Sequence, residues 1–202
     1  MYWGQPDASV SFCEQKYTIT PYIAEYYNTM SAFSYMIVGI IFYFTKIRYI
    51  SNVLLLMSLG TMALHCTLRY YGQWMDEISM LILSFYIIKY LRDELLKKST
   101  LNIYLCGIIA GYFLFNKFFI YFFLMFTGMQ LYIYNLAQLK RNQNKRVENL
   151  LIKAYTISLI SATICWFLDQ IACYYVRDFQ LHAIWHVGTA LAMLFGFTAI
   201  II

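Results

Sequence analysis

The chain is poor in charge, in proline and in histidine. Only 12% of its 202 residues are Asp, Glu, Lys or Arg, whereas soluble globular domains carry about a quarter. This composition excludes an ordinary water-soluble globular protein. Both prolines lie before residue 22, so no proline interrupts a later helix. The three histidines are His65, His182 and His186, and their placement is the most informative feature of the chain.

Hydrophobic residues make up 61% of the chain and occur in long runs. A helix of about 20 apolar residues crosses a bilayer. We therefore predict an all-α polytopic membrane protein, a bundle of seven transmembrane helices in a single domain of residues 1–202, with a polar N-terminal head at residues 1–27. The predicted spans are about 28–45, 50–69, 77–92, 100–116, 118–138, 150–170 and 183–202.

The positive residues between these spans predict the orientation. Eleven of the 15 Lys and Arg residues lie at 46–48, 89–98 and 140–153, around the first, third and fifth loops. By the positive-inside rule, the N-terminal head is lumenal or outside and the C-terminus is cytosolic. The net charge of +5 is thus a topology signal, and we expect no nucleic-acid partner.

The histidines come together in this topology. His182 and His186 are four residues apart, so a helix presents both on one face. His65 lies near the lumenal end of the second span, at the depth at which the seventh span begins, and Asp76 shares that level. Three imidazoles are the ligand set of a hydrolytic zinc, which activates water near neutral pH. We predict an intramembrane zinc site; the alternative for the His182–His186 pair alone is hydrogen bonding between helices.

Two further side chains suit this chemistry. Asp76 can take a proton from the attacking water and return it to a leaving amine. Thr61, one turn before His65, can donate a hydrogen bond to a developing oxyanion. The alternative for Thr61 is a hydrogen bond to the carbonyl four residues earlier in its own helix.

Cysteine and glycine spacing adds two expectations. Cys13 and Cys173 both fall in predicted lumenal segments, where disulfides form, so they are either paired or two free thiols. Gly107 and Gly111 form a GxxxG pattern, which predicts close helix packing.

These residues resemble the alkaline ceramidases, within a wider superfamily of seven-helix membrane hydrolases. The segments that carry the resemblance are Tyr2–Ser31, Gly60–Thr61 with His65, Asp76–Glu77, Trp166 with Asp169 and Cys173, and His182 with His186. The resemblance implies seven helices around a zinc ion with a lipid-accessible cavity, in an endoplasmic reticulum or Golgi membrane. The implied reaction is hydrolysis of the amide bond of ceramide to sphingosine and a free fatty acid.

The family's functional positions carry over to individual residues. They are the zinc ligands His65, His182 and His186, the acid–base group Asp76, and the disulfide pair Cys13 and Cys173. Thr61 occupies the position of a serine. Its hydroxyl can still donate, but the added methyl crowds the site.

The resemblance also implies a calcium site in the head, at Ser11, Phe12, Glu14, Lys16 and Glu25. Ser11 stands where an aspartate is usual, Phe12 where a tryptophan is usual, and Lys16 where an asparagine is usual. A missing carboxylate weakens a hard-cation site, and an ammonium among the ligands weakens it further. We therefore expect Lys16 to replace the calcium ion by pairing with Glu14 and Glu25, which makes activity calcium-independent.

Other functions are compatible with parts of this pattern. The same zinc site suits hydrolysis of another lipid amide or ester. A seven-helix receptor resembling the progestin and adipoQ receptors shares the serine–histidine–aspartate and HxxxH pattern, but it predicts a sizeable cytosolic N-terminal region. The short head and the positive residues disfavour that reading, and the retained histidines and Asp76 disfavour an inactive homologue. The expected partners are the bilayer and a ceramide or related lipid.

Overall fold

The computed structural model describes residues 2–97, 102–115, 119–143 and 146–202, with side chains omitted at 142 and 143. Lys98 and Lys145 of the positive loops, and the ends of the predicted spans at 100–101, 116 and 118, lie outside these residues. The described residues form helices and no strand, which confirms the all-α prediction. The elements are α1 (Tyr26–Ser31), α2 (Phe33–Phe42), α3 (Arg48–Thr67), α4 (Tyr70–Leu95), α5 (Ile103–Phe115), α6 (Phe119–Gln143), α7 (Arg146–Ile171), α8 (Cys173–Val176), the 3-10 helix η1 (Arg177–Phe179) and α9 (Leu181–Ile201).

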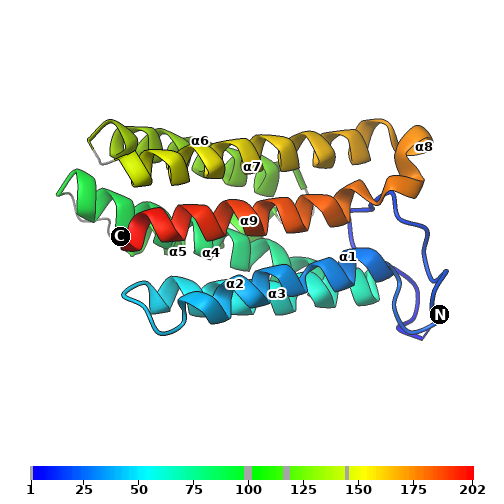
Figure 1. The fold of residues 1–202 in the computed structure, drawn as a ribbon. Helices are drawn as coiled ribbons and strands as arrows, with labels where there is room; N and C mark the ends of the chain where they lie inside the picture. Colours follow the sequence, from blue (N-terminus) through cyan, green and yellow to red (C-terminus); the bar gives the residue numbers. More distant parts are fainter. Residues whose placement is uncertain (1, 98–101, 116–118, 144–145) are drawn as a thin grey trace.

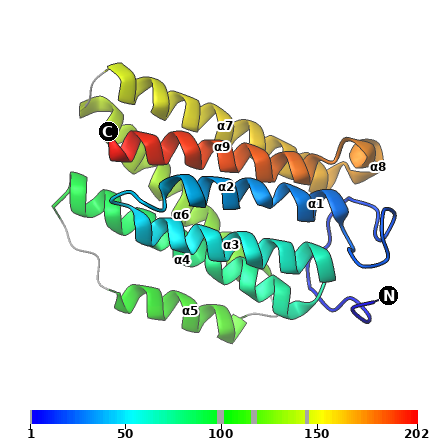
Figure 2. The same cartoon turned by 60° about the horizontal axis from the view of Figure 1, so that its bottom comes forward.

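The long helices run side by side and close into a ring. α9 packs against α7 on one side and against α1 and α2 on the other; α3 packs against α2 and α4, α4 against α6, and α6 against α7. α5 lies outside this ring, in contact with α4 and α6 (Figure 2). The N-terminal head and α8 lie together at one end of the bundle, opposite the C-terminus (Figure 1). This end carries the candidate site.

Each predicted span overlaps a helix, and the first is divided between α1 and α2. The division falls at Ala32, whose carbonyl oxygen accepts a hydrogen bond from Ser58 Oγ at 2.9 Å and from the backbone N–H of Tyr35 at 3.1 Å. A side chain that inserts into the hydrogen-bond ladder is a common cause of a helix break. The apolar pattern of 28–45 does not reveal this break, because its cause lies on α3.

Length and composition identify an integral membrane protein. Among the described residues, four helices are long and apolar enough to cross a membrane: Arg48–Thr67, Phe119–Arg141, Arg146–Ile171 and Leu181–Ile201. α5 is apolar but only 13 residues long, whereas α4 has the length but carries the buried carboxylates Asp76 and Glu77 and a charged C-terminal end. The polytopic membrane class is thus supported, while the count of seven spans stays a prediction.

The hairpin of α3 and α4 brings two backbones into direct contact. Leu68 joins the helices in the left-handed conformation, with a φ of 52°, which gives a tight turn. A Cβ on Gly60 would lie 2.8 Å from the backbone N of Asp76, and one on Gly72 would lie 2.7 Å from the Cα of Leu64. The two glycines therefore allow α3 and α4 to approach closely at the level of Asp76.

Only one glycine of the GxxxG pattern on α5 lies close to a neighbouring residue. Among the described residues outside its own helix backbone, no heavy atom lies within 4 Å of the position that a Cβ on Gly107 would take, whereas Gly111 faces the ring of Tyr121. The prediction that both glycines serve close helix packing is wrong for Gly107, because α5 lies at the outside of the ring.

Gly60→Ala should destabilise the protein by about 1–3 kcal/mol, because the added methyl meets backbone atoms that cannot move independently. Gly107→Ala is the matched control; it adds a methyl in open space and should be neutral or stabilising by up to about 1 kcal/mol. Thermal unfolding in detergent micelles measures both. Equal stability of the two variants would contradict the close α3–α4 approach.

Candidate metal centre

The three histidines lie together inside the bundle, at the end that carries the head. His65 is in the last turn of α3, and His182 and His186 lie near the start of α9. Their ring centroids are separated by 5.1 Å for His65–His182, 5.0 Å for His65–His186 and 4.6 Å for His182–His186. One nitrogen of each ring lies within 4.8 Å of the others, and all three side chains are buried. This arrangement can hold a metal ion.

Hydrogen bonds orient two of the rings. His65 Nδ1 lies 2.6 Å from Glu25 Oε2, and a carboxylate can only accept, so His65 Nδ1 carries the proton. His186 Nδ1 lies 2.7 Å from Ser31 Oγ, which itself donates to the carbonyl oxygen of Asn28 at 2.9 Å. Ser31 Oγ therefore accepts from His186. Both rings thus keep Nε2 as the free donor atom for a metal.

This donor set fits zinc. Metal-bound histidines normally donate their other ring N–H to a carboxylate, a carbonyl or a similar acceptor, as His65 and His186 do here. His182 Nδ1 is buried and has no hydrogen-bond partner among the described residues. Three imidazoles in a closed, buried group match the ligands of catalytic zinc sites better than those of calcium or magnesium, which prefer oxygen.

Thr61 and Asp76 face one another across the α3–α4 contact. Thr61 Oγ1 lies 2.5 Å from Asp76 Oδ1 and 2.9 Å from the carbonyl oxygen of Met57. The local contact to Met57, one of the two alternatives for Thr61, is therefore present together with the contact to Asp76. Because the hydroxyl has one proton, it donates fully to only one of these acceptors at a time. Both side chains are buried.

The head is fastened beside the histidines. Cys13 and Cys173 form a disulfide, with their Cα atoms 5.3 Å apart, and the backbone N–H of Cys13 donates to Asp169 Oδ2 at 3.2 Å. The ring of Phe12 lies against His182 and His65, with centroid separations of 3.8 Å and 4.9 Å. Through Phe12, the head thus covers two of the three histidines.

The residues expected to bind calcium surround an ammonium group. Lys16 Nζ lies 2.5 Å from the carbonyl oxygen of Phe12, 2.9 Å from that of Glu14 and 2.5 Å from Glu25 Oε1. The expected pairing with Glu25 is present. The contact with Glu14 is made by its backbone carbonyl, because the Glu14 carboxylate instead accepts the backbone N–H groups of Tyr27 and Asn28 at 2.7 and 2.9 Å. The fifth residue, Ser11, is exposed.

The two buried glutamates differ in their electrostatics. Burial alone would raise the pKa of Glu25, but the hydrogen bond from His65 and the ammonium of Lys16 hold that pKa below its usual value. Burial raises the pKa of Glu14, although the two backbone N–H groups that it accepts act to lower it. Glu25 therefore stays ionised, so that it accepts the hydrogen bond from His65 Nδ1.

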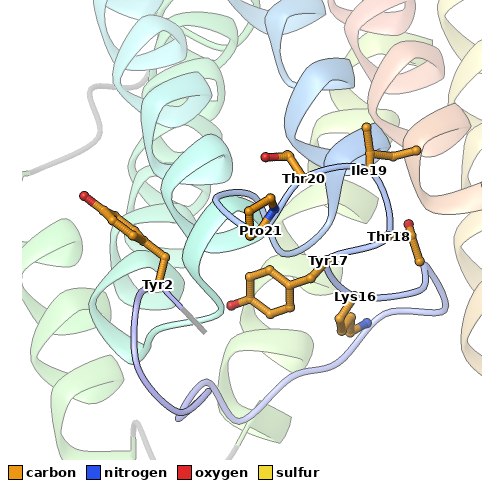
Figure 3. A pocket seen from close by; sticks show the side chains of 7 residues that line it. All are labelled: Tyr2, Lys16, Tyr17, Thr18, Ile19, Thr20 and Pro21. Carbon is orange, nitrogen blue, oxygen red and sulfur yellow. The ribbon is translucent and has the colours of Figure 1, made fainter.

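A recess of about 570 Å³ opens on the outer side of the head (Figure 3). Its lining is Tyr2, Lys16, Tyr17, Thr18, Ile19, Thr20 and Pro21. The three histidines are not part of it. Lys16 therefore borders the recess, and its ammonium contacts the buried Glu25.

Sequence reasoning assigned no role to Asn28 or Ser31, which orient His186. A usable signal existed, since Asn28, Ser31, Ser34 and Tyr35 repeat at helical spacing and place polar groups on one face of an otherwise apolar span. Ser34 Oγ donates to the carbonyl oxygen of His186 at 3.4 Å, and the Tyr35 hydroxyl lies 2.6 Å from Thr189 Oγ1. This polar face joins α1 and α2 to α9.

Cys173→Ser should lower the free energy of unfolding by about 2–5 kcal/mol, the usual cost of removing a native disulfide from a small domain. The head would then be free to move away from α8. Cys106→Ser removes an exposed free thiol and serves as the control. Thermal unfolding of both variants in micelles, without reductant, is the measurement; a Cys173→Ser protein as stable as the control would contradict this role of the disulfide.

Comparisons with known proteins identify the family of the chain. The family described as Ceramidase matches residues 4–202. The chain is 28% identical over 211 residues to an alkaline ceramidase of Arabidopsis thaliana, covering 92% of this chain and 80% of that protein. It is 29% identical over 224 residues to alkaline ceramidase 3 of Mus musculus, covering 94% and 81%, and 27% identical over 201 residues to an alkaline ceramidase of Drosophila melanogaster, covering 88% and 71%. With nearly its whole length matched, the chain belongs to the ceramidase family.

Proposed function

We propose that this protein is an integral-membrane, zinc-dependent ceramidase that hydrolyses the amide bond of ceramide to sphingosine and a free fatty acid. The observation that carries the proposal is the buried group of His65, His182 and His186, with two of its rings oriented by Glu25 and Ser31. Membership of the ceramidase family supports the substrate.

His65, His182 and His186 would hold the zinc ion. When bound, zinc held by three imidazoles supplies Lewis acidity and activates water near neutral pH. The protein fixes this ligand set through the contacts of Glu25 and Ser31. Phe12 and the surrounding helices keep bulk water away from the rings, which strengthens electrostatic interactions there.

Asp76 is the proposed acid–base group. Its carboxylate takes the proton of the attacking water and returns it to the nitrogen of the leaving sphingoid base. Thr61 donates to Asp76 Oδ1 in the resting site. Once Asp76 is protonated it needs this donor less, and the Thr61 hydroxyl becomes free to donate to the oxyanion that forms on the amide carbonyl.

The proposed topology has seven spans, with the head on the lumenal side of an endoplasmic reticulum or Golgi membrane. α1 and α2 together form the first span, and α3, α4, α5, α6, α7 and α9 form the others. Arg48 at the start of α3, Arg92 in the last turn of α4, and Lys140 and Arg141 in the last turn of α6 lie at the ends away from the head. This distribution agrees with a cytosolic location of those ends.

We also propose that the protein works without calcium. Calcium binds to carboxylate and carbonyl oxygens, and the oxygens of Phe12, Glu14 and Glu25 that face one another in the head already surround Lys16 Nζ. The ammonium occupies the position expected for the calcium ion and supplies one of its two positive charges.

His186→Ala should reduce sphingosine release from ceramide by about 100-fold or more, since even residues that only orient metal ligands affect activity by about 10–100-fold. It should also reduce the zinc content of the purified protein. Asp76→Asn should reduce release by about 10²–10⁴-fold while zinc content stays normal, because Asp76 is not a ligand. The measurement is sphingosine release with ceramides of varied acyl chain, beside metal analysis of each variant.

Val187→Ala is the matched control, because Val187 is adjacent to His186 on α9 but exposed on the outside of the bundle. Release unchanged in His186→Ala would rule out the zinc mechanism. A protein that contains zinc but releases sphingosine from no ceramide would indicate another lipid amide or ester as substrate, or a receptor role.

Calcium removal should leave activity unchanged. The purified protein is assayed in EGTA with free zinc kept constant by a zinc buffer, so that only calcium is withdrawn. Loss of sphingosine release under these conditions, with recovery on adding calcium, would show that Lys16 does not replace the ion.

A further inference from the structure

The Glu25 carboxylate connects Lys16 to the metal centre. Its side chain is completely buried, whereas that of Lys16 is 29% exposed. Glu25 Oε2 accepts from His65 Nδ1 at 2.6 Å and from Asn28 Nδ2 at 3.1 Å. Glu25 Oε1 faces Lys16 Nζ at 2.5 Å and has no other hydrogen-bond partner among the described residues. One oxygen therefore orients a histidine, and the other depends on the lysine.

The ammonium of Lys16 is itself fully engaged. An ammonium has three N–H donors, and Lys16 Nζ has three oxygen neighbours: the carbonyls of Phe12 and Glu14, and Glu25 Oε1. The segment that supplies the two carbonyls is anchored by the Cys13–Cys173 disulfide. Lys16 thus holds Glu25 against a fixed part of the head.

Lys16 also contacts Phe12, whose ring lies against two of the histidines. The carbonyl of Phe12 accepts from Lys16, while its ring lies 3.8 Å from His182 and 4.9 Å from His65, centroid to centroid. The same ammonium therefore contacts the residue that orients one histidine and the residue that covers two of them.

We propose that Lys16 is a positioning residue of the metal centre, which fixes the Glu25 carboxylate and so the orientation of His65 for zinc. The inference rests on the zinc site of the proposed function and adds a residue that does not touch the metal. A buried carboxylate that loses its only positive partner is strongly destabilised, and Glu25 Oε1 would have no donor to hold it. The carboxylate is then free to rotate, and His65 loses its fixed orientation.

The test is zinc affinity, measured on the full-length protein in micelles by competition with a chromogenic zinc chelator. Lys16→Met keeps the length of the side chain but removes the charge and the donors. Its zinc affinity should fall by about 10–100-fold, the usual effect of losing a residue that orients a metal ligand. Lys153→Met, at an exposed lysine of α7, is the matched control and should bind zinc as the wild type does.

Two more variants separate a positioning role from a general loss of structure. Lys16→Arg keeps a positive charge and donors for Glu25, so it should retain more zinc affinity than Lys16→Gln, which has donors but no charge. This comparison decides the question even if Lys16→Met does not fold. Equal affinity of the Arg and Gln variants, or a Lys16→Met protein that is folded and binds zinc normally, would overturn the inference.

Activity distinguishes this inference from the proposed function. A wild-type protein that binds zinc but hydrolyses no ceramide contradicts the proposed function alone. A wild-type protein that binds no zinc would overturn the metal centre and this inference with it.

Discussion

A polar group inside a bundle surrounded by lipid has to find its partner within the protein, because no water is present to replace one. At the head end of this bundle, a connected set of polar contacts supplies many of these partners. Glu25 contacts both His65 and Lys16. Ser31 links His186 to the carbonyl oxygen of Asn28. Asp169 accepts a hydrogen bond from the backbone N–H of Cys13. The positions of the head, α1, α3 and α9 relative to one another follow from these contacts.

The same requirement explains which parts of the site were predictable. His65, His182, His186 and Asp76 stand out in an apolar sequence because each is costly in a membrane, and helix topology places them at one level. The pairing of Cys13 with Cys173 agrees with the prediction that both lie in one compartment. These are properties of single residues and of their position along a helix.

The remaining parts depend on contacts between elements, which no single segment encodes. Lys16 Nζ donates to the backbone carbonyl of Glu14 and not to its carboxylate. Residue types alone do not reveal such a backbone contact. At the break at Ala32, the carbonyl oxygen accepts a hydrogen bond from Ser58 on another helix. GxxxG spacing favoured Gly107 for close packing, yet Gly60 and Gly72, which lack that spacing, make the close contact. Similarly, length and hydropathy identify four spans among the described residues, because the first predicted span is divided between α1 and α2, α4 carries carboxylates and α5 is short.

The order of the ligands along the chain has a consequence for biosynthesis. His65 comes early, whereas His182 and His186 belong to α9, the last helix of the described chain. The partner of Cys13 also comes late, 160 residues further on. A nascent chain that has inserted its helices up to α7 therefore has one imidazole of the three and an unfastened head. The group of three histidines can therefore form only after α9 has inserted, and a chain that stops at α7 lacks a complete candidate metal site.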